Sequence, residues 1–124
     1  MAMSPNEYHK LMNMASLIRR QVSEGVQEID EIMKVQAKIG DSDWVTVCLD
    51  RGLGTEVYEG IVKEYLRVGW YKVYVAVVHQ HDDSTYTQFV FCTEDSEEKF
   101  EKSCGYNGLN KWYSYTHNFI EKSV

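Results

Sequence analysis

The sequence has few of the residues that break, cross-link or anchor a chain: one proline, three cysteines and no long apolar run in 124 residues. A single proline beside 44% hydrophobic residues argues against a disordered chain. Cys48, Cys92 and Cys104 are odd in number and irregular in spacing, which argues against a disulfide framework and suits a reducing compartment. No apolar run approaches the roughly 20 residues of a membrane helix, and no signal segment is evident. These absences predict a single-domain, soluble cytoplasmic protein with no membrane partner.

Positive charge is scarce as well. The formal net charge is −6, and Arg19-Arg20 is the only basic pair. Binding to a nucleic-acid backbone depends on clustered Lys and Arg, so nucleic acid is disfavoured as a partner. Acidic residues gather at positions 94–98, but Lys99 and Lys102 follow at once, which is typical of a solvated helix start.

The N-terminal region, residues 4–39, has a helical pattern. Ser4, Pro5 and Glu7 form a capping box with proline at the first helical position. A helix from Pro5 to Ile39 would be about 50 Å long at roughly 1.5 Å per residue, more than a domain of this size can cover. The sequence leaves two interpretations: Gly25 breaks the region into two helices, or part of it packs on another copy. The following positions, alternately four and three residues apart, form a heptad seam: Leu11, Ala15, Ile18, Val22, Gly25, Ile29, Ile32, Gln36 and Ile39.

Residues 44–93 form the predicted α/β core. An amphipathic helix over 56–68 ends at Gly69-Trp70, where an alternating strand pattern begins. Shorter strand patterns occupy 44–50 and 85–93. Strand, helix and strand predict a parallel right-handed βαβ unit, with the last strand added antiparallel to give a small mixed three-stranded sheet. Both faces of this sheet are apolar, so the crossover helix leaves one face for other segments or a second subunit to cover.

Residues 94–124 predict a helical C-terminal segment. Asp95 and Glu98 open a short helix that carries Phe100 and Cys104 inward. The aromatics that follow also favour strands. The fold class predicted for the single domain is therefore α+β: N-terminal helices, a β-α-β-β core and a C-terminal helical segment. Helical spacing continues through Leu109, Trp112, Thr116 and Phe119.

A glycine turn offers the first chemical hypothesis. Gly52-x-Gly54 lies between a strand and a helix start, the context of a dinucleotide-binding fingerprint. Val57 replaces the third glycine, and Glu56 and Glu59 would set like charge against a phosphate. The favoured interpretation is an ordinary turn and no cofactor, with a small-nucleotide-binding protein as an alternative.

A histidine pair offers the second chemical hypothesis. His79 and His81 lie on the same side of a strand end beside Asp82, and imidazole with carboxylate suits a divalent metal. The pair resembles the His-x-His that follows a strand in metallo-hydrolases, so a small metal-dependent hydrolase is the enzymatic alternative. A metal site needs three or four placed ligands, which favours a polar turn. A third hypothesis, Cys104 activated by His117, has no supporting motif.

Aromatic residues with polar tips gather near the C-terminal end, and such residues are enriched at protein interfaces. The sequence favours a non-enzymatic module that binds a protein partner and forms a homodimer. A specific version is an acidic inhibitor of a nucleic-acid-processing enzyme. The predicted interface residues are Ile18, Val22, Ile29 and Ile32 of the seam and Tyr106, Trp112, Tyr113 and Tyr115 of the aromatic group.

Overall fold

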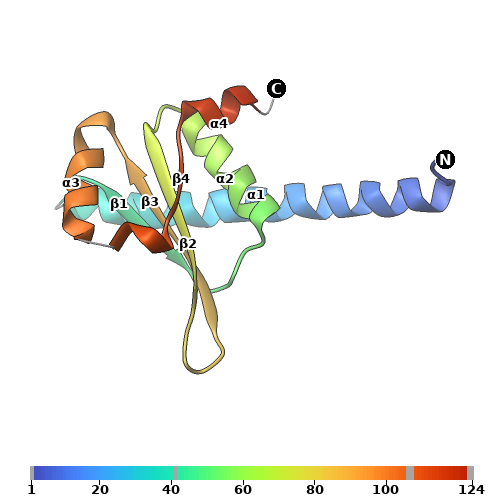
Figure 1. Cartoon of the computed structure of the whole chain (residues 1–124), viewed down its shortest axis with the longest axis horizontal. Helices are drawn as coiled ribbons and strands as arrows, with labels where there is room; N and C mark the ends of the chain where they lie inside the picture. Colours follow the sequence, from blue (N-terminus) through green and yellow to red (C-terminus); the bar gives the residue numbers. More distant parts are fainter. Residues whose placement is uncertain (1, 41, 106–107, 123–124) are drawn as a thin grey trace.

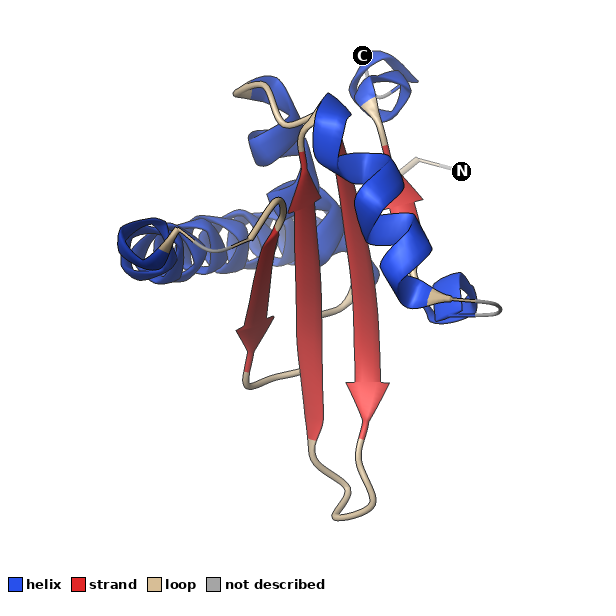
Figure 2. Cartoon of the chain, turned by 90° about the vertical axis from the view of Figure 1, so that its left-hand side faces the viewer, coloured by secondary structure: helices blue, strands red, loops and turns tan. Residues whose placement is uncertain are grey.

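The computed structural model describes residues 2–40, 42–105 and 108–122. A long helix passes one edge of a four-stranded sheet and extends well beyond the rest of the molecule, while shorter helices flank the sheet (Figures 1 and 2). The α+β class predicted from the sequence is confirmed. Among the described helices, none combines the length and the apolar character needed to cross a membrane. The elements in chain order are α1 (Pro5–Ile39), β1 (Val45–Leu49), α2 (Thr55–Arg67), β2 (Lys72–His79), β3 (Thr85–Cys92), α3 (Glu94–Cys104), a 3-10 helix η1 (Gly108–Lys111), β4 (Tyr113–Tyr115) and α4 (His117–Lys122).

Helix α1 is continuous over its 35 residues. The predicted cap is present: the Ser4 side chain accepts a hydrogen bond from the Glu7 amide at 3.2 Å. At the other end Gly40 adopts a left-handed conformation and closes the helix. The interpretation that Gly25 breaks the helix is wrong, because this residue has a packing role instead. A Cβ at Gly25 would lie 2.6 Å from Cδ1 of Ile61, so glycine lets α1 and α2 approach closely.

The junction of α2 and β2 forms as the sequence predicts. Gly69, at φ +112°, lies in the conformational region that favours glycine. Its amide donates to the carbonyl of Leu66 at 3.2 Å, and the Trp70 amide donates to the carbonyl of Tyr65 at 3.2 Å. These two bonds make a Schellman motif that ends α2. The half-buried ring of Trp70 then packs at 5.7 Å from the ring of Phe91.

The sheet differs from the prediction in strand number and pairing. Its order is β1-β3-β2-β4, and every neighbouring pair is antiparallel. The predicted parallel βαβ pairing is wrong because β3 returns from a tight hairpin and lies between β1 and β2. The hairpin turn is closed by Asp82, whose carboxylate accepts bonds from the amide and hydroxyl of Ser84 at 3.1 and 2.6 Å. Residue Asp83 adopts φ +64° in this turn.

The two faces of the sheet are covered by different helices. Helices α1, α2 and α4 pack over the face that carries Val47, Val75 and Phe89. The opposite face, with Tyr74 and Val90, is covered by α3 and the segment that follows it. A second subunit is therefore not needed to cover this face, which removes one of the two reasons for predicting a dimer.

The C-terminal segment is only partly helical, which corrects the prediction. Helix α3 is capped by Thr93, whose side chain and that of Ser96 form a capping box in place of the predicted acidic cap. A short fourth strand follows, because Tyr113 and Tyr115 pair with Val75 and Val73 at the open edge of β2. The β propensity of this aromatic stretch prevailed over its helical spacing.

Candidate functional site

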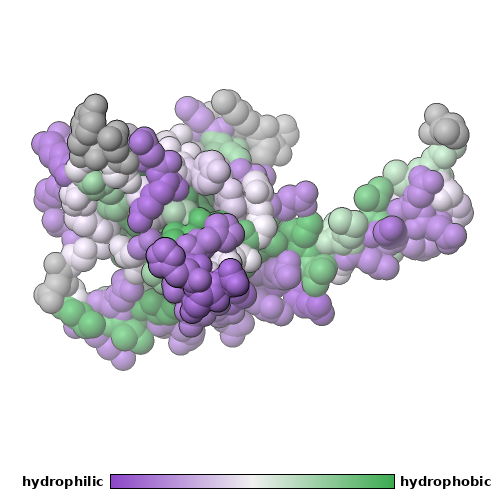
Figure 3. All heavy atoms as spheres, turned by 60° about the horizontal axis from the view of Figure 1, so that its bottom comes forward, coloured by the Kyte–Doolittle hydropathy of each residue, from purple (hydrophilic) through white to green (hydrophobic). Residues whose placement is uncertain are grey.

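The first half of α1 forms an exposed arm, defined here as residues 5–17. Figure 1 shows it extending away from the sheet, and Figure 3 shows apolar patches along it between polar ones. Every residue of the arm is exposed. Leu11 is 52% exposed and Met14 is 54% exposed. The other large apolar side chains that the arm exposes are Tyr8, Met12 and Leu17.

The second half of α1 carries the same apolar stripe, but there it is covered. Ile29 is completely buried against α2 and the sheet, and Ile18, Val22 and Ile32 are partly buried around it. Of the predicted interface residues on the seam, Ile29 is thus used inside the chain. The stripe leaves the covered region at Ile18 and continues onto the arm, since Leu11 and Ala15 keep the heptad spacing.

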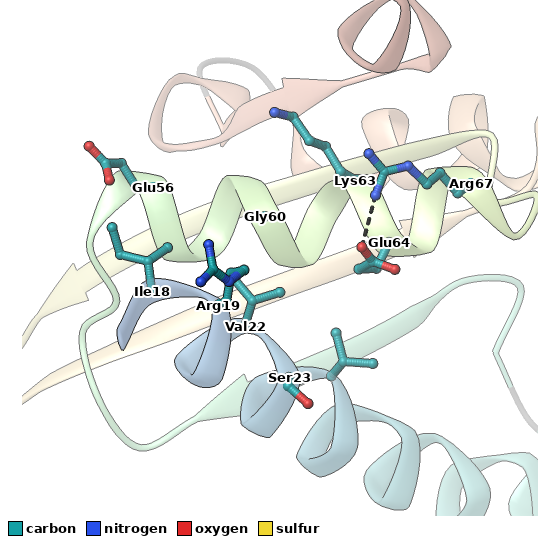
Figure 4. A pocket seen from close by; sticks show the side chains of 10 residues that line it. Ile18, Arg19, Val22, Ser23, Glu56, Gly60, Lys63, Glu64 and Arg67 are labelled. Carbon is teal, nitrogen blue, oxygen red and sulfur yellow. Dashed lines mark hydrogen bonds and ion pairs between the residues drawn. The ribbon is translucent and has the colours of Figure 1, made fainter. Parts of the chain in front are cut away.

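An open groove of about 530 Å³ lies where the arm joins the rest of the molecule, between α1 and α2 (Figure 4). Ile18, Val22 and Val26 form its α1 wall, and Gly60 contributes bare backbone on the α2 side. A Cβ at Gly60 would lie 2.6 Å from Cγ2 of Val22, so this second glycine also permits a close approach of the helices. Charged and polar side chains form the rest of the lining: Arg19, Ser23, Glu56, Lys63, Glu64 and Arg67.

Contacts along the second half of α1 hold this helix on α2 and the sheet. The Tyr65 hydroxyl donates to Oδ1 of Asp30 at 2.7 Å, and burial together with this bond raises the pKa of Tyr65. The Arg51 guanidinium makes two 2.9 Å bonds to the carboxylate of Glu28. The Gln36 side chain donates to the Thr46 carbonyl of β1 at 2.7 Å. The arm therefore projects from a well-anchored base.

Side chains of β3 bond to and pack on the glycine turn between β1 and α2. The Thr87 hydroxyl donates to the Arg51 carbonyl at 2.8 Å and accepts from the Leu53 amide at 2.9 Å. A Cβ at Gly52 would lie 2.6 Å from the Thr85 side chain, so this glycine serves the packing of the turn on β3. This arrangement supports the structural interpretation of Gly52-x-Gly54 over a dinucleotide fingerprint.

The histidine pair lies at the tip of the β2–β3 hairpin. His79, His81 and Asp82 are all exposed. The Asp82 carboxylate is engaged by Ser84, which lowers the pKa of Asp82. Over residues 2–40, 42–105 and 108–122, no three His, Cys, Asp or Glu side chains gather in a way that could hold a metal ion. Among the described residues, His79, His81 and Asp82 therefore neither gather into a metal site themselves nor join another ligand to form one.

The cysteine hypothesis is not supported by the placement of its two residues. Cys104 packs at the edge of the cluster around Phe100 on the α3 face. His117 opens α4, which packs on α2 at the other face of the sheet. Burial raises the pKa of the Cys48 thiol, and burial raises the pKa of Cys92 to about 11. Both shifts disfavour a reactive thiolate.

The predicted aromatic interface is divided between the two faces. The half-buried Trp112 packs edge-on against Phe100 and belongs to the α3 face. Tyr115 is half-buried on the α2 face, where its hydroxyl donates to Glu59 at 2.9 Å. Tyr113 is 61% exposed, with its ring stacked on that of a buried tyrosine in α2. Tyr106 lies outside the described residues. These aromatics therefore do not form one surface.

No protein-family model matches the chain, and no similar curated protein or solved structure was found.

A cluster of ionisable residues, missed from the sequence, joins α3 to β2. The Lys72 ammonium lies 3.2 Å from Glu97 and 3.1 Å from Glu101, and the Tyr74 hydroxyl also donates to Glu101. The bond from Tyr74 keeps the pKa of Glu101 below its usual value, and Lys72 adds to this effect. Burial alone would lower the pKa of Lys72, but its bonds to Glu101 and Glu97 outweigh burial and raise it. We interpret the cluster as structural, because each polar group has a partner within it.

The groove was also missed, although the sequence contains a signal for it. Glycine inside a helix costs about 1 kcal/mol relative to alanine, so an interior glycine often marks a close approach. Gly25 and Gly60 are such residues, and each receives a side chain of the facing helix. That both glycines lie at the contact between α1 and α2 is shown only by the tertiary structure.

Proposed function

We propose that this chain is a non-enzymatic interaction module that acts by binding a protein partner through the arm of α1. The observation that carries the proposal is the continuity of one apolar stripe along α1. Ile29 on this stripe is fully buried, whereas Leu11 is 52% exposed. Contiguous exposed apolar surface of this kind marks interaction sites.

The exposed surface is large enough to contribute to binding. Five large apolar side chains of the arm are between 45% and 57% exposed. Burying one such side chain completely stabilises by about 1.5–3 kcal/mol, so covering the exposed halves of five contributes roughly 4–7 kcal/mol. Association costs about 4–15 kcal/mol, which makes a partner with an apolar surface of its own necessary. Such a partner doubles the apolar area that is removed from water.

The distribution of charge favours the arm over the acidic surface around α3 as the site that binds a partner. Lysines lie beside many carboxylates of α3 and its surroundings: Lys99 is 3.6 Å from Asp43, and Lys102 is 3.0 Å from Glu98. These pairs reduce the negative potential that an inhibitor would present to a basic groove. The narrower inhibitor version stays a prediction from composition, and the proposal is limited to binding through the arm.

A photoreactive amino acid placed on the arm tests the proposal. Position 11 lies on the apolar stripe, and position 13 lies on the opposite polar face of the same helix. We expect the probe at Leu11 to form a defined covalent adduct in the cell that produces the protein, and the probe at Asn13 to form none. The adduct partner is identified by mass spectrometry.

Direct binding of the purified pair completes the test. Leu11→Glu should weaken binding at least tenfold, whereas Asn13→Glu, which adds the same charge on the polar face, should leave it unchanged. Equal labelling from positions 11 and 13, or a Leu11→Glu variant that binds normally, would refute binding through the arm.

A further inference from the structure

We infer that the partner of the arm is the arm of a second copy of this chain, packed antiparallel across a two-fold axis that crosses the apolar seam at the level of Asn13. This inference depends on the proposed function, since it uses the same surface. It adds the identity of the partner, the direction of packing and the register.

The spacing of the arm is that of a helix that pairs with another helix. Tyr8, Leu11, Ala15 and Ile18 continue the alternation of three and four residues that is buried further along α1. A two-fold interface requires a surface that is complementary to itself. Two arms supply such a surface, because each presents the same apolar stripe.

The position of the folded body fixes the direction of packing. From Val22 onward the stripe of α1 faces α2 and the sheet, so the body occupies that side of the helix. Parallel arms in register would bring two bodies to the same end and the same side, where they would overlap. Antiparallel arms place the two bodies at opposite ends of the pair, as the one-sided shape in Figure 1 allows.

The register follows from matching large and small residues. With the two-fold axis level with Asn13 along the helix, Leu11 of one copy lies opposite Ala15 of the other, and Tyr8 lies opposite Ile18. Large and small side chains then alternate along the seam. Met12 and Met14 lie on either side of the seam beside the axis, so Met12 lies near Met12 of the other copy and Met14 near Met14. Their flexible thioether side chains fill irregular space there.

The same register uses the groove at the base of the arm. Residues opposite one another add up to 26 in number, so the helix start at Ser4 of one copy comes level with Val22 of the other. The exposed Met3, just before this start, reaches the mouth of the groove lined by Ile18 and Val22. The exposed stripe and the groove are thus covered in one arrangement.

Charge agrees with the arrangement. The arm contains one acidic residue, Glu7, and one basic residue, Lys10, so its formal charge is zero, whereas the whole chain carries −6. Two arms meet without net repulsion. The negative charge lies on the bodies, which antiparallel packing keeps apart.

Sedimentation of the full chain tests the assembly. We expect a species of twice 14.5 kDa at tens of micromolar for the wild type. Leu11→Glu with Met14→Glu should sediment as a monomer and weaken self-association at least tenfold. The control Asn13→Glu with Ser16→Glu adds the same charge on the polar face and should remain a dimer. Circular dichroism should show all three to be equally folded, since these positions are exposed in the single chain.

Cysteine cross-linking tests the register. In a Cys48→Ser, Cys104→Ser background, Met14→Cys should form a disulfide with its own counterpart, and Leu11→Cys should instead link to Ala15→Cys when the two variants are mixed. Ser16→Cys on the polar face should form none. Efficient self-linking of Leu11→Cys without that of Met14→Cys would show parallel packing and overturn the inference.

A monomeric wild type, or a dimer that persists in the Leu11→Glu, Met14→Glu variant, also overturns the inference of an antiparallel dimer. The proposed function would still stand if the photoreactive probe at Leu11 labels a different protein, so the two failures are distinguishable.

Discussion

The two halves of α1 share one sequence pattern and have opposite surroundings. Ile29 and Leu11 both occupy the heptad seam, yet Ile29 is fully buried and Leu11 is 52% exposed. The difference arises because α2 and β1 pack on the second half of α1, and this cover reaches no further along the helix than Ile18. A heptad pattern therefore marks the apolar face of a helix without stating what covers it.

The small residues of the seam show the same contrast. Gly25 faces the buried side chain of Ile61, which fills the space that a larger residue would take. Ala15, in the arm, is exposed. A small residue is thus required for helix packing in one half of α1, whereas in the single chain nothing packs on the other half.

The largest expected effect separates the two halves by truncation. Ile29→Ala should destabilise the fold by about 2–5 kcal/mol, because it leaves a cavity in the core. Leu11→Ala, the same kind of truncation on the same stripe, should change stability by no more than about 0.5 kcal/mol in the monomer. Urea denaturation at low protein concentration measures both. A cost at Leu11 that matches the cost at Ile29 would show that the arm packs within its own chain.

An intermediate effect is expected from enlarging the small residues. Gly25→Leu should destabilise by about 1–3 kcal/mol, since the added side chain must displace the fully buried Ile61 or separate the helices. Ala15→Leu should stay within about 0.5 kcal/mol in the monomer. Melting temperatures of the two variants, recorded at equal and low concentration, compare them. If Gly25→Leu proves neutral, the close approach of α1 and α2 is not needed for the fold.

The smallest expected effect concerns the response of the folded body to acid. The pKa of Glu101 is lower in the folded state, so its contribution is present above the unfolded value of about 4.3 and is lost as pH falls through the folded value. Glu101→Gln should therefore cost about 1 kcal/mol at pH 7, a figure reduced because the side chain is one-third exposed, and little near pH 3. Unfolding free energies at the two pH values provide the check, and an equal cost at both would exclude a role for the Glu101 charge.

Much of the fold follows from residues that are close in sequence. Ser4 and Glu7 determine the start of α1, and Gly69 with Trp70 determines the end of α2, because caps are formed between neighbouring residues. The sequence predicts the faces of the central strands for the same reason, since alternate side chains point to opposite sides.

The sequence also indicated part of the candidate site. The seam from Leu11 to Ile39 predicted an apolar face on α1, and the exposed arm is one half of that face. In the single chain the predicted interface residue Ile29 is fully buried. Trp112 and Tyr115 of the predicted aromatic group lie on opposite faces of the sheet.

The sequence by itself determined the start of α1, the end of α2, the β2–β3 hairpin and the apolar stripe, because these depend on spacing and on contacts a few residues apart. Only the tertiary structure decided that β3 lies between β1 and β2, that Gly25 receives Ile61 and that the stripe is covered no further than Ile18. Those features depend on which surfaces meet across long separations in the chain. Several segments of this chain have faces that are apolar enough to pack together, so which of them meet is determined by the packing of the whole domain.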